Sequence, residues 1–239
     1  MNRQQKTGGL PKGHAVAALS TTVLFVISFV FILFVWPGYG VRGPEDVRDP
    51  AVILPAVARA PILLIWLAIN IPIAAALCFV VLDLNQRLQV RPTSLIRFAF
   101  VVGHASALFF FVVGVLRFIG YPYLADQYSA NSASAASAYS GYLVVDNVFD
   151  RAAIFTSGLW LVMVSWAALK VGALQRLLSY FGTVTGVAGI IGAILPSFAP
   201  IALLLYIIWF LWFGIRDVRN RGSVSVPYTS PVSDSSRPN

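Results

Sequence analysis

The first long apolar run, AVAALSTTVLFVISFVFILFVW, constrains the fold most, because it covers residues 15–36 without one charged side chain. A helix needs about 20 consecutive apolar residues to cross the hydrocarbon core of a bilayer, so this run predicts a membrane-spanning helix. The basic segment before it resembles the start of a signal peptide. However, the run is too long for a signal peptide, and no small-residue cleavage site follows it. We therefore expect an uncleaved first span.

Five further apolar runs follow, and only 11% of the 239 residues are charged, whereas soluble domains average about 25%. Lipid must therefore be the solvent for part of the chain. We predict an all-α polytopic bundle of six transmembrane helices within residues 15–216. A basic N-terminal segment, 1–14, precedes the bundle, and a disordered tail, 217–239, follows it. The predicted spans are 15–36, 61–82, 96–119, 147–169, 177–195 and 199–215.

Two connectors and one proline modify this plan. Residues 37–60 combine Pro, Gly and mixed charges, and residues 124–143 include SANSASAASAYSG, so both are expected to be loops, the second one flexible. Pro72 lies within the second span, where it removes a backbone donor and clashes with the carbonyl of Ala68. This span should be kinked near Asn70.

Cations are distributed unequally between the two sets of connectors. The termini and the connectors on their side carry twelve of the 17 cations and three acids, whereas the opposite side carries five cations and six acids. The positive-inside rule then places both termini in the cytoplasm. We expect the protein itself to lie in the cytoplasmic membrane of a bacterium. The clusters are short and lie between apolar runs, so membrane orientation explains the net charge of +8 and no nucleic-acid partner is expected.

Asn70 and His104 are polar residues within the predicted spans. Ionisable groups inside membranes are costly and often functional, so the two residues form a candidate intramembrane polar site. A neutral histidine is less costly than a charged one, and it can simply bond to Asn70, a serine or a backbone carbonyl. A structural role, a proton relay and a ligand contact all remain open.

A candidate charged cluster on the outer face consists of Arg117, at the end of the third span, and Asp146, Asp150 and Arg151, at the start of the fourth. Asp146 and Asp150 are one helical turn apart, and acids in the first turn suit the positive end of a helix. One interpretation is capping and ion pairing among these four residues. The other is a polar mouth that binds a cation or a lipid headgroup.

Four glycines in the fifth span, Gly182, Gly186, Gly189 and Gly192, give that span one surface of small residues. Glycine lets a second helix approach closely in lipid. The pattern predicts packing inside the bundle or, alternatively, a homodimer face.

Known catalytic and cofactor motifs are not found in the sequence. It contains no P-loop, GxGxxG or HExxH motif and no lysine within a span that could carry retinal. Ser157 lies in FTSG, which lacks the first glycine of the GxSG of intramembrane serine proteases. The single cysteine, Cys78, cannot form an intrachain disulfide or a thiolate cluster, and His104 has no second histidine facing it for haem. We expect no cofactor and no metal, and an enzyme is the less favoured class.

The segment ALQRLLSYFGTVTGVAGIIGAIL and the basic linker before LIRFAFVVGHASALFFFVVGVLRF resemble a family of uncharacterised bacterial integral membrane proteins, the DUF4386 type. The resemblance covers about residues 60–216. Family members usually carry a proline in the connector that is ALQRLLSYFG here. The resemblance implies a bundle of six or seven helices and brings no activity or catalytic residues.

Three functions are therefore considered. The favoured one is an accessory or assembly subunit of a larger membrane complex, whose partners are lipids, other membrane subunits or a second copy of the chain. The second is a small permease or channel that uses Asn70, His104 and the outer charged cluster. The third is an enzyme that modifies lipids.

Overall fold

All regular structure in the described residues is helical. The computed structural model describes residues 12–60, 62–89 and 93–222, and it contains no strand within those ranges. Six helical segments are long and apolar enough to cross a membrane, which confirms the predicted all-α membrane bundle of six spans. These segments are Ala15–Gly38, Ile62–Leu88, Ser94–Ala130, Ser132–Val171, Arg176–Ile194 and Pro196–Arg219.

The spans are built from helices that continue into one another. The first span is formed by α1, a π-helical segment η1 and α2, and the second span by α5 and α6. The elements are α1 (Lys12–Val30), η1 (Phe31–Val35), α2 (Trp36–Gly38), α3 (Pro44–Arg48), α4 (Pro50–Arg59), α5 (Ile62–Ala68), α6 (Asn70–Leu88), α7 (Ser94–Ala130), α8 (Ser132–Val171), α9 (Arg176–Ile194), η2 (Pro196–Phe198) and α10 (Ala199–Gly222).

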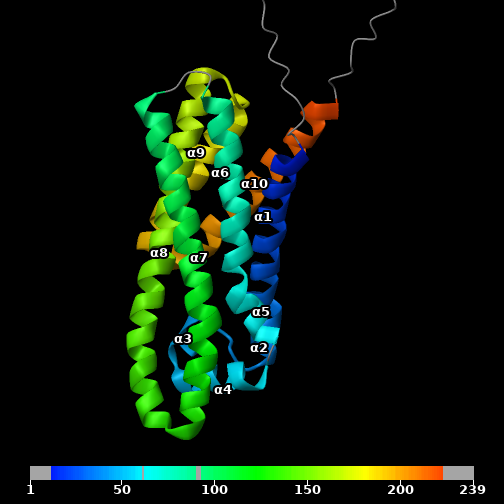
Figure 1. Cartoon of the computed structure of the whole chain (residues 1–239). Coiled ribbons are helices and arrows are strands. Elements are labelled where there is room, and N and C mark those ends of the chain that lie inside the picture. The colour runs from blue at the N-terminus through cyan, green and yellow to red at the C-terminus, as the bar shows by residue number, and fades with distance from the viewer. Residues whose placement is uncertain (1–11, 61, 90–92, 223–239) are drawn as a thin grey trace, which may run out of the picture.

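The spans form a closed ring in sequence order. Helix α1 packs on α6, α6 on α7, α7 on α8, α8 on α9 and α9 on α10, and α10 closes the ring against α1. Gly214 permits this closure, because a Cβ there would lie 2.8 Å from the side chain of Leu19. The start of α1 and the end of α10 lie at the same end of the bundle, which we call the terminal end; the opposite end is the distal end (Figure 1).

The second span is interrupted where the sequence predicts a weak point. Helix α5 ends at Ala68 and α6 begins at Asn70, and the amide of Ile69 donates to the carbonyl of Trp66, three residues earlier. Pro72 explains the break, since it supplies no N–H and its ring clashes with the preceding turn. Gly114 of α7 packs against this point: a Cβ there would lie 2.9 Å from the backbone nitrogen of Ile71.

The expected flexible loop at 124–143 is wrong. Helix α7 continues to Ala130 and α8 begins at Ser132, so the connection is short and the two helices form one long hairpin. Asn131 caps α8, since its side chain accepts a hydrogen bond of 3.1 Å from the Ser134 amide. The alanines and serines, which are read as a linker from composition, are compatible with helix once α7 lies beside them.

The ends of the chain also differ in part from the prediction. Residues 12–14 belong to α1, and residues 217–222 continue α10 rather than forming a disordered tail. The remaining parts of the two predicted terminal segments, 1–11 and 223–239, lie outside the described residues.

The connector at 37–60 is not a plain loop, because it contains α3 and α4. Asp49 caps α4 by accepting from the Ala51 amide at 2.9 Å, and the hydroxyl of Tyr139 donates to the Val47 carbonyl at 2.5 Å. Together with α2, α5 and the distal parts of α7 and α8, these helices form a second hydrophobic core, which we call the distal cap; Figure 1 shows where these helices lie. Its buried residues are Trp36, Val41, Ile53, Leu54, Ala56, Val57, Ala60, Leu63, Leu67, Tyr121, Leu124, Ala125 and Tyr139.

The larger core lies between the spans and is filled by aromatic rings. Trp160 and Trp209 are fully buried, with ring centroids 6.4 Å apart in an edge-to-face arrangement. Phe25 of α1 packs against Phe110 of α7 and Phe210 of α10. The rings therefore connect helices that are not neighbours in the helical ring, α1 with α7 and α8 with α10.

The distal cap should respond to loss of core volume independently of the spans. Leu54 is fully buried, so Leu54→Ala should destabilise the cap by about 2–5 kcal/mol, the usual effect of such a cavity. The measurement is hydrogen exchange of the α3 and α4 amides in detergent. Val52→Ala, at a half-buried position of the same helix, is the matched control and should change exchange much less. Equal effects of the two variants would contradict this description of the cap.

Candidate functional site

Arg117 forms a buried ion-pair cluster with two carboxylates of α8, which we call the Arg117 cluster. Its Nε and Nη2 donate to the two oxygens of Asp146 at 2.9 and 3.0 Å, and Nη2 also donates to Asp150 at 2.9 Å. The side chains of Arg117 and Asp146 are 15% and 6% exposed, and that of Asp150 is 31% exposed. The two-pronged contact with Asp146 fixes the guanidinium plane and the relative height of α7 and α8.

Aromatic side chains surround the Arg117 cluster on its distal side. The guanidinium carbon lies 5.8 Å from the ring centroid of Trp66, a cation–π distance. Tyr142 donates to the Leu116 carbonyl at 3.1 Å, and its ring stands edge-to-face with that of Tyr121. These rings limit the access of water and strengthen the ion pairs by lowering the local dielectric.

The cluster lies near the predicted distal boundary of the membrane. At 1.5 Å per residue, Arg117 is about 35 Å along α7 from Ser94, and the hydrocarbon core is about 30 Å thick. Charges are less costly at that depth than at the bilayer centre. However, Asp146 and Asp150 do not lie in the first turn of their helix, because α8 begins at Ser132. The predicted interaction with a helix N-terminus is therefore wrong.

Arg151 does not make an ion pair with the cluster. Its Nη1 donates instead to the carbonyl of Ala193 at 2.9 Å, in the last turn of α9. A cation at a helix C-terminus interacts favourably with the carbonyls that have no partner within the helix. The contact of Arg151 with Ala193 thus fixes the position along α8 at which α9 ends.

The structure does not bring Asn70 and His104 into one site. Asn70 is buried beside Gly114, while His104 lies ten residues earlier on α7, about 15 Å along the helix axis. The Nδ1 atom of His104 is 2.9 Å from the Phe100 carbonyl of its own helix, and its ring lies against that of Phe100. This geometry corresponds to the structural alternative, in which the imidazole bonds to a backbone carbonyl.

The four glycines of α9 are buried within the chain. A Cβ at Gly186 would lie 2.6 Å from the carbonyl oxygen of Gly158, so α8 and α9 pack backbone to backbone. A Cβ at Gly182 would lie 2.6 Å from Trp209 Nε1, and one at Gly189 would lie 2.5 Å from the hydroxyl of Tyr206. Gly192 packs against Ala199, after the turn into α10. These positions face α8 and α10.

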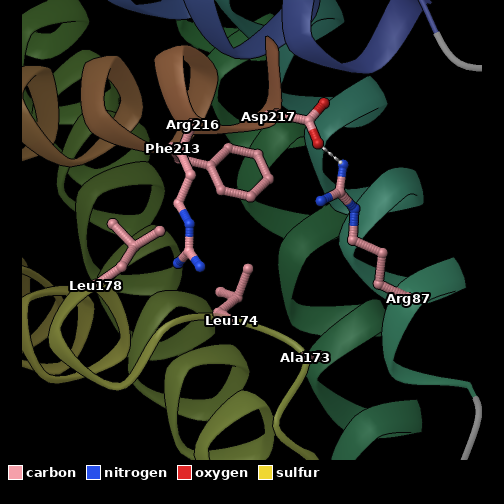
Figure 2. A pocket seen from close by; sticks show the side chains of 7 residues that line it. All are labelled: Arg87, Ala173, Leu174, Leu178, Phe213, Arg216 and Asp217. Carbon is pink, nitrogen blue, oxygen red and sulfur yellow. Dashed lines mark hydrogen bonds and ion pairs between the residues drawn. The ribbon is translucent and has the colours of Figure 1, made fainter. Parts of the chain in front are cut away.

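A second charged cluster, which the sequence analysis missed, lies at the terminal end. Arg87 of α6 forms ion pairs with Asp83, at 2.8 Å, and with Asp217 of α10, and we call these three residues the Arg87 cluster. Figure 2 shows the contact between Arg87 and Asp217. The guanidinium of Arg87 also lies 5.5 Å from the ring centroid of Phe213. The four-residue spacing of Asp83 and Arg87 is a sequence signal for the first pair. No local signal identifies Asp217, because 130 residues separate it from Arg87.

Among the residues that the structure describes, the polar groups in the middle of the bundle do not form a recognisable catalytic arrangement. The hydroxyl of Ser157 donates to the Ile154 carbonyl at 2.8 Å and lies 3.0 Å from the Tyr206 hydroxyl. Within the described part of the chain, no three His, Cys, Asp or Glu side chains are grouped so that they could hold a metal ion.

The fold and these sites define a multi-pass helical membrane protein with charged clusters at both ends of the bundle. No protein-family model, curated protein or solved structure matches this chain. The resemblance to the DUF4386 type therefore stays a prediction.

Removal of Arg117 should destabilise the bundle strongly, because Asp146 would remain buried without its counter-charge. We expect Arg117→Leu to cost about 3–5 kcal/mol, the usual effect of breaking a buried ion pair. The measurement is thermal unfolding of the full chain in mild detergent. The triple variant Arg117→Leu/Asp146→Leu/Asp150→Leu should recover much of the loss, since no buried charge remains unpaired. A triple variant less stable than Arg117→Leu would refute this account.

Gly186→Ala should loosen the α8–α9 contact, because the added methyl group would meet the carbonyl of Gly158. The matched control is Gly141→Ala on α8, where nothing lies within 4 Å of the added carbon. The control should stabilise by about 0.5–1 kcal/mol through the higher helix propensity of alanine. Opposite shifts of the unfolding temperature are expected, and a neutral Gly186→Ala would disprove the close approach.

Proposed function

We propose that this protein is a non-enzymatic accessory or assembly subunit that binds a partner membrane protein along the distal part of α8. The proposal rests on a helix-packing seam of α8. This seam continues along α8 beyond the last residue of α9, the helix that packs on it. The seam is the surface of α8 that packs on α9.

Residues seven apart share one face of a helix, and Ser165, Gly158, Arg151 and Val144 have this spacing. The first three contact α9. Ser165 lies against Gly182, Gly158 against Gly186, and Arg151 bonds to Ala193. Val144 is the next residue at this spacing toward the start of α8. It lies beyond the end of α9 and is 65% exposed.

Val148 continues a neighbouring row of residues on the same surface of α8, the row that includes Val162. Val162, two heptads further along α8, packs on Gly186, whereas Val148 is 60% exposed. Val144 and Val148 are one turn apart, so they form an apolar continuation of the α8–α9 seam, which we call the Val144 seam. An apolar helix of a partner, placed end to end with α9, fits this surface because it would extend contacts that α8 already makes.

The other functions considered receive less support. A transport path through Asn70, His104 and the Arg117 cluster would need groups that act together. Asn70 and His104 lie far apart along the bundle, however, and Arg117 is engaged by two carboxylates. A lipid-modifying enzyme would need an activated nucleophile, and the hydroxyl of Ser157 lies beside a backbone carbonyl and a tyrosine.

We also propose in which membrane the protein lies and how it is oriented there. The surplus of cations on the connectors at the terminal end supports insertion in a bacterial cytoplasmic membrane with both termini in the cytoplasm. The Val144 seam then lies at the outer surface, where a partner within the same membrane can reach it. Fusion of reporter tags to the two ends should place both on the cytoplasmic side.

Charged side chains on the seam should release the partner. In membranes of the native host solubilised in mild detergent, the wild-type chain is expected in a complex larger than its own 25.9 kDa. Val144→Lys/Val148→Lys should reduce that complex to the size of the single chain in its micelle, because each charge would be buried at the interface. Native mass spectrometry gives the masses and shows whether the partner is a different protein or a second copy.

The matched control is Tyr123→Lys, at a 62% exposed position of α7 in the same distal region but outside the seam. This variant should keep the complex intact. A wild-type chain that runs alone, or equal loss of the complex in both variants, would disprove the proposed interface.

A further inference from the structure

A pocket lies at the terminal end of the bundle, far from the Val144 seam. It opens between α6, the connection from α8 to α9, and α10 (Figure 2). Its lining residues include Arg87, Leu174, Leu178, Phe213, Arg216 and Asp217. It therefore combines two guanidinium groups and one carboxylate with an apolar wall.

The two arginines of the pocket differ in their partners. Arg87 is held by Asp83 and Asp217. The side chain of Arg216 points away from Asp217, and its guanidinium lies between Leu174 and Leu178 (Figure 2). Arg216 is half-buried, and within the described residues its guanidinium has no hydrogen-bond or ion-pair partner. A guanidinium has five N–H donors, so this group is suited to an acceptor supplied by a ligand.

The surrounding charges favour an anion. Among the described residues the acids of the terminal end are Asp83 and Asp217, and both lie in the Arg87 cluster. The cations of that end with described side chains are Arg87, Arg97, Lys170, Arg176, Arg216 and Arg219. Arg216 is thus the one pocket cation that is not in contact with a carboxylate, within a region where cations exceed acids.

The depth of the pocket fits a lipid headgroup. Arg216 is about 26 Å along α10 from Ala199, which places it near the terminal boundary of a hydrocarbon core about 30 Å thick. Leu174, Leu178 and Phe213 provide an apolar wall beside the guanidinium. Helix α9 begins at the same place, and its N-cap residue Gln175 makes no side-chain capping hydrogen bond.

From this geometry we propose that the pocket binds the phosphate of an anionic phospholipid, with Arg216 as the main donor to the phosphate and Leu174 beside the glycerol or the first acyl carbons. A guanidinium matches phosphate with two parallel hydrogen bonds, which an ammonium cannot provide. Basic pockets between membrane helices are known to hold anionic headgroups. The same chemistry accepts a soluble phosphate, so the experiment must separate the two sources.

The test is native mass spectrometry of the purified full chain in uncharged detergent. Dioleoylphosphatidylglycerol, dioleoylphosphatidylcholine, glycerol 3-phosphate and inorganic phosphate are titrated separately. We expect the phosphatidylglycerol to bind at least about tenfold more tightly than the phosphatidylcholine. Arg216→Gln should weaken binding of the phosphatidylglycerol at least about tenfold, because the charge-assisted hydrogen bonds of the guanidinium are lost. Arg216→Lys should retain part of the affinity, because it keeps the charge but not the planar fork.

Arg219→Gln is the matched control, since Arg219 is an exposed arginine one turn further along the same helix. It should change the affinity less than about twofold. Leu174→Gln should weaken binding of phosphatidylglycerol and leave binding of inorganic phosphate unchanged. An unchanged elution volume on gel filtration verifies that each variant is folded.

The outcomes are distinct. Arg216-dependent binding of phosphatidylglycerol alone supports a lipid site. Arg216-dependent binding of inorganic phosphate or glycerol 3-phosphate with similar strength supports the phosphate site but assigns it to a soluble ligand. Equal effects of Arg216→Gln and Arg219→Gln, or equal affinity for the two lipids, would overturn the proposal. None of these results depends on the partner proposed for the Val144 seam.

Discussion

The structure depends first on the need of every backbone N–H and C=O group in lipid to find a partner inside the protein. A helix meets this need within one segment, so the six apolar runs have a single solution. The exception in the second span is consistent with that rule. Where Pro72 removes a donor, the interruption at Ile69 is covered by Gly114 of α7, so the irregular backbone faces protein instead of lipid.

The two cores of the molecule are held together by different forces. Between the spans lipid is as apolar as leucine, so association relies on close packing, as at Gly186 and Gly158, and on the interlocked rings of Trp160 and Trp209. The distal cap extends past the length that the hydrocarbon requires, so burial of residues such as Leu54 there is driven by release from water. The Arg117 cluster lies at the boundary between the core of the spans and the distal cap.

The interactions at the ends of the bundle fix where each helix begins and ends along the bundle axis, and these positions create the proposed sites. Arg117 aligns α7 with α8, and Arg151 holds the end of α9 against α8. Since α9 ends there while α8 continues, Val144 and Val148 remain uncovered. At the terminal end Arg87 joins α6 to α10, and this leaves Arg216 beside the start of α9 without a carboxylate. The helix lengths thus produce one apolar surface and one cationic pocket at opposite ends.

The sequence by itself determined the number of spans and the weak point near Ala68, because apolar length and proline chemistry are local signals. It gave ion pairing of Arg117 with Asp146 and Asp150 only as one of two interpretations, and the contacts themselves come from the tertiary structure. It did not reveal that residues 124–143 are helical, since their composition is compatible with both a linker and a helix, and the packing against α7 and the cap decides between them. It separated neither Arg151 from the charged cluster nor Asn70 from His104, because helix register decides both. Asp217 reaches Arg87 only because α10 closes the ring against α1, and a contact over 130 residues has no trace in local pattern. The tertiary structure alone decided which charges meet, because that depends on where each helix ends relative to its neighbours.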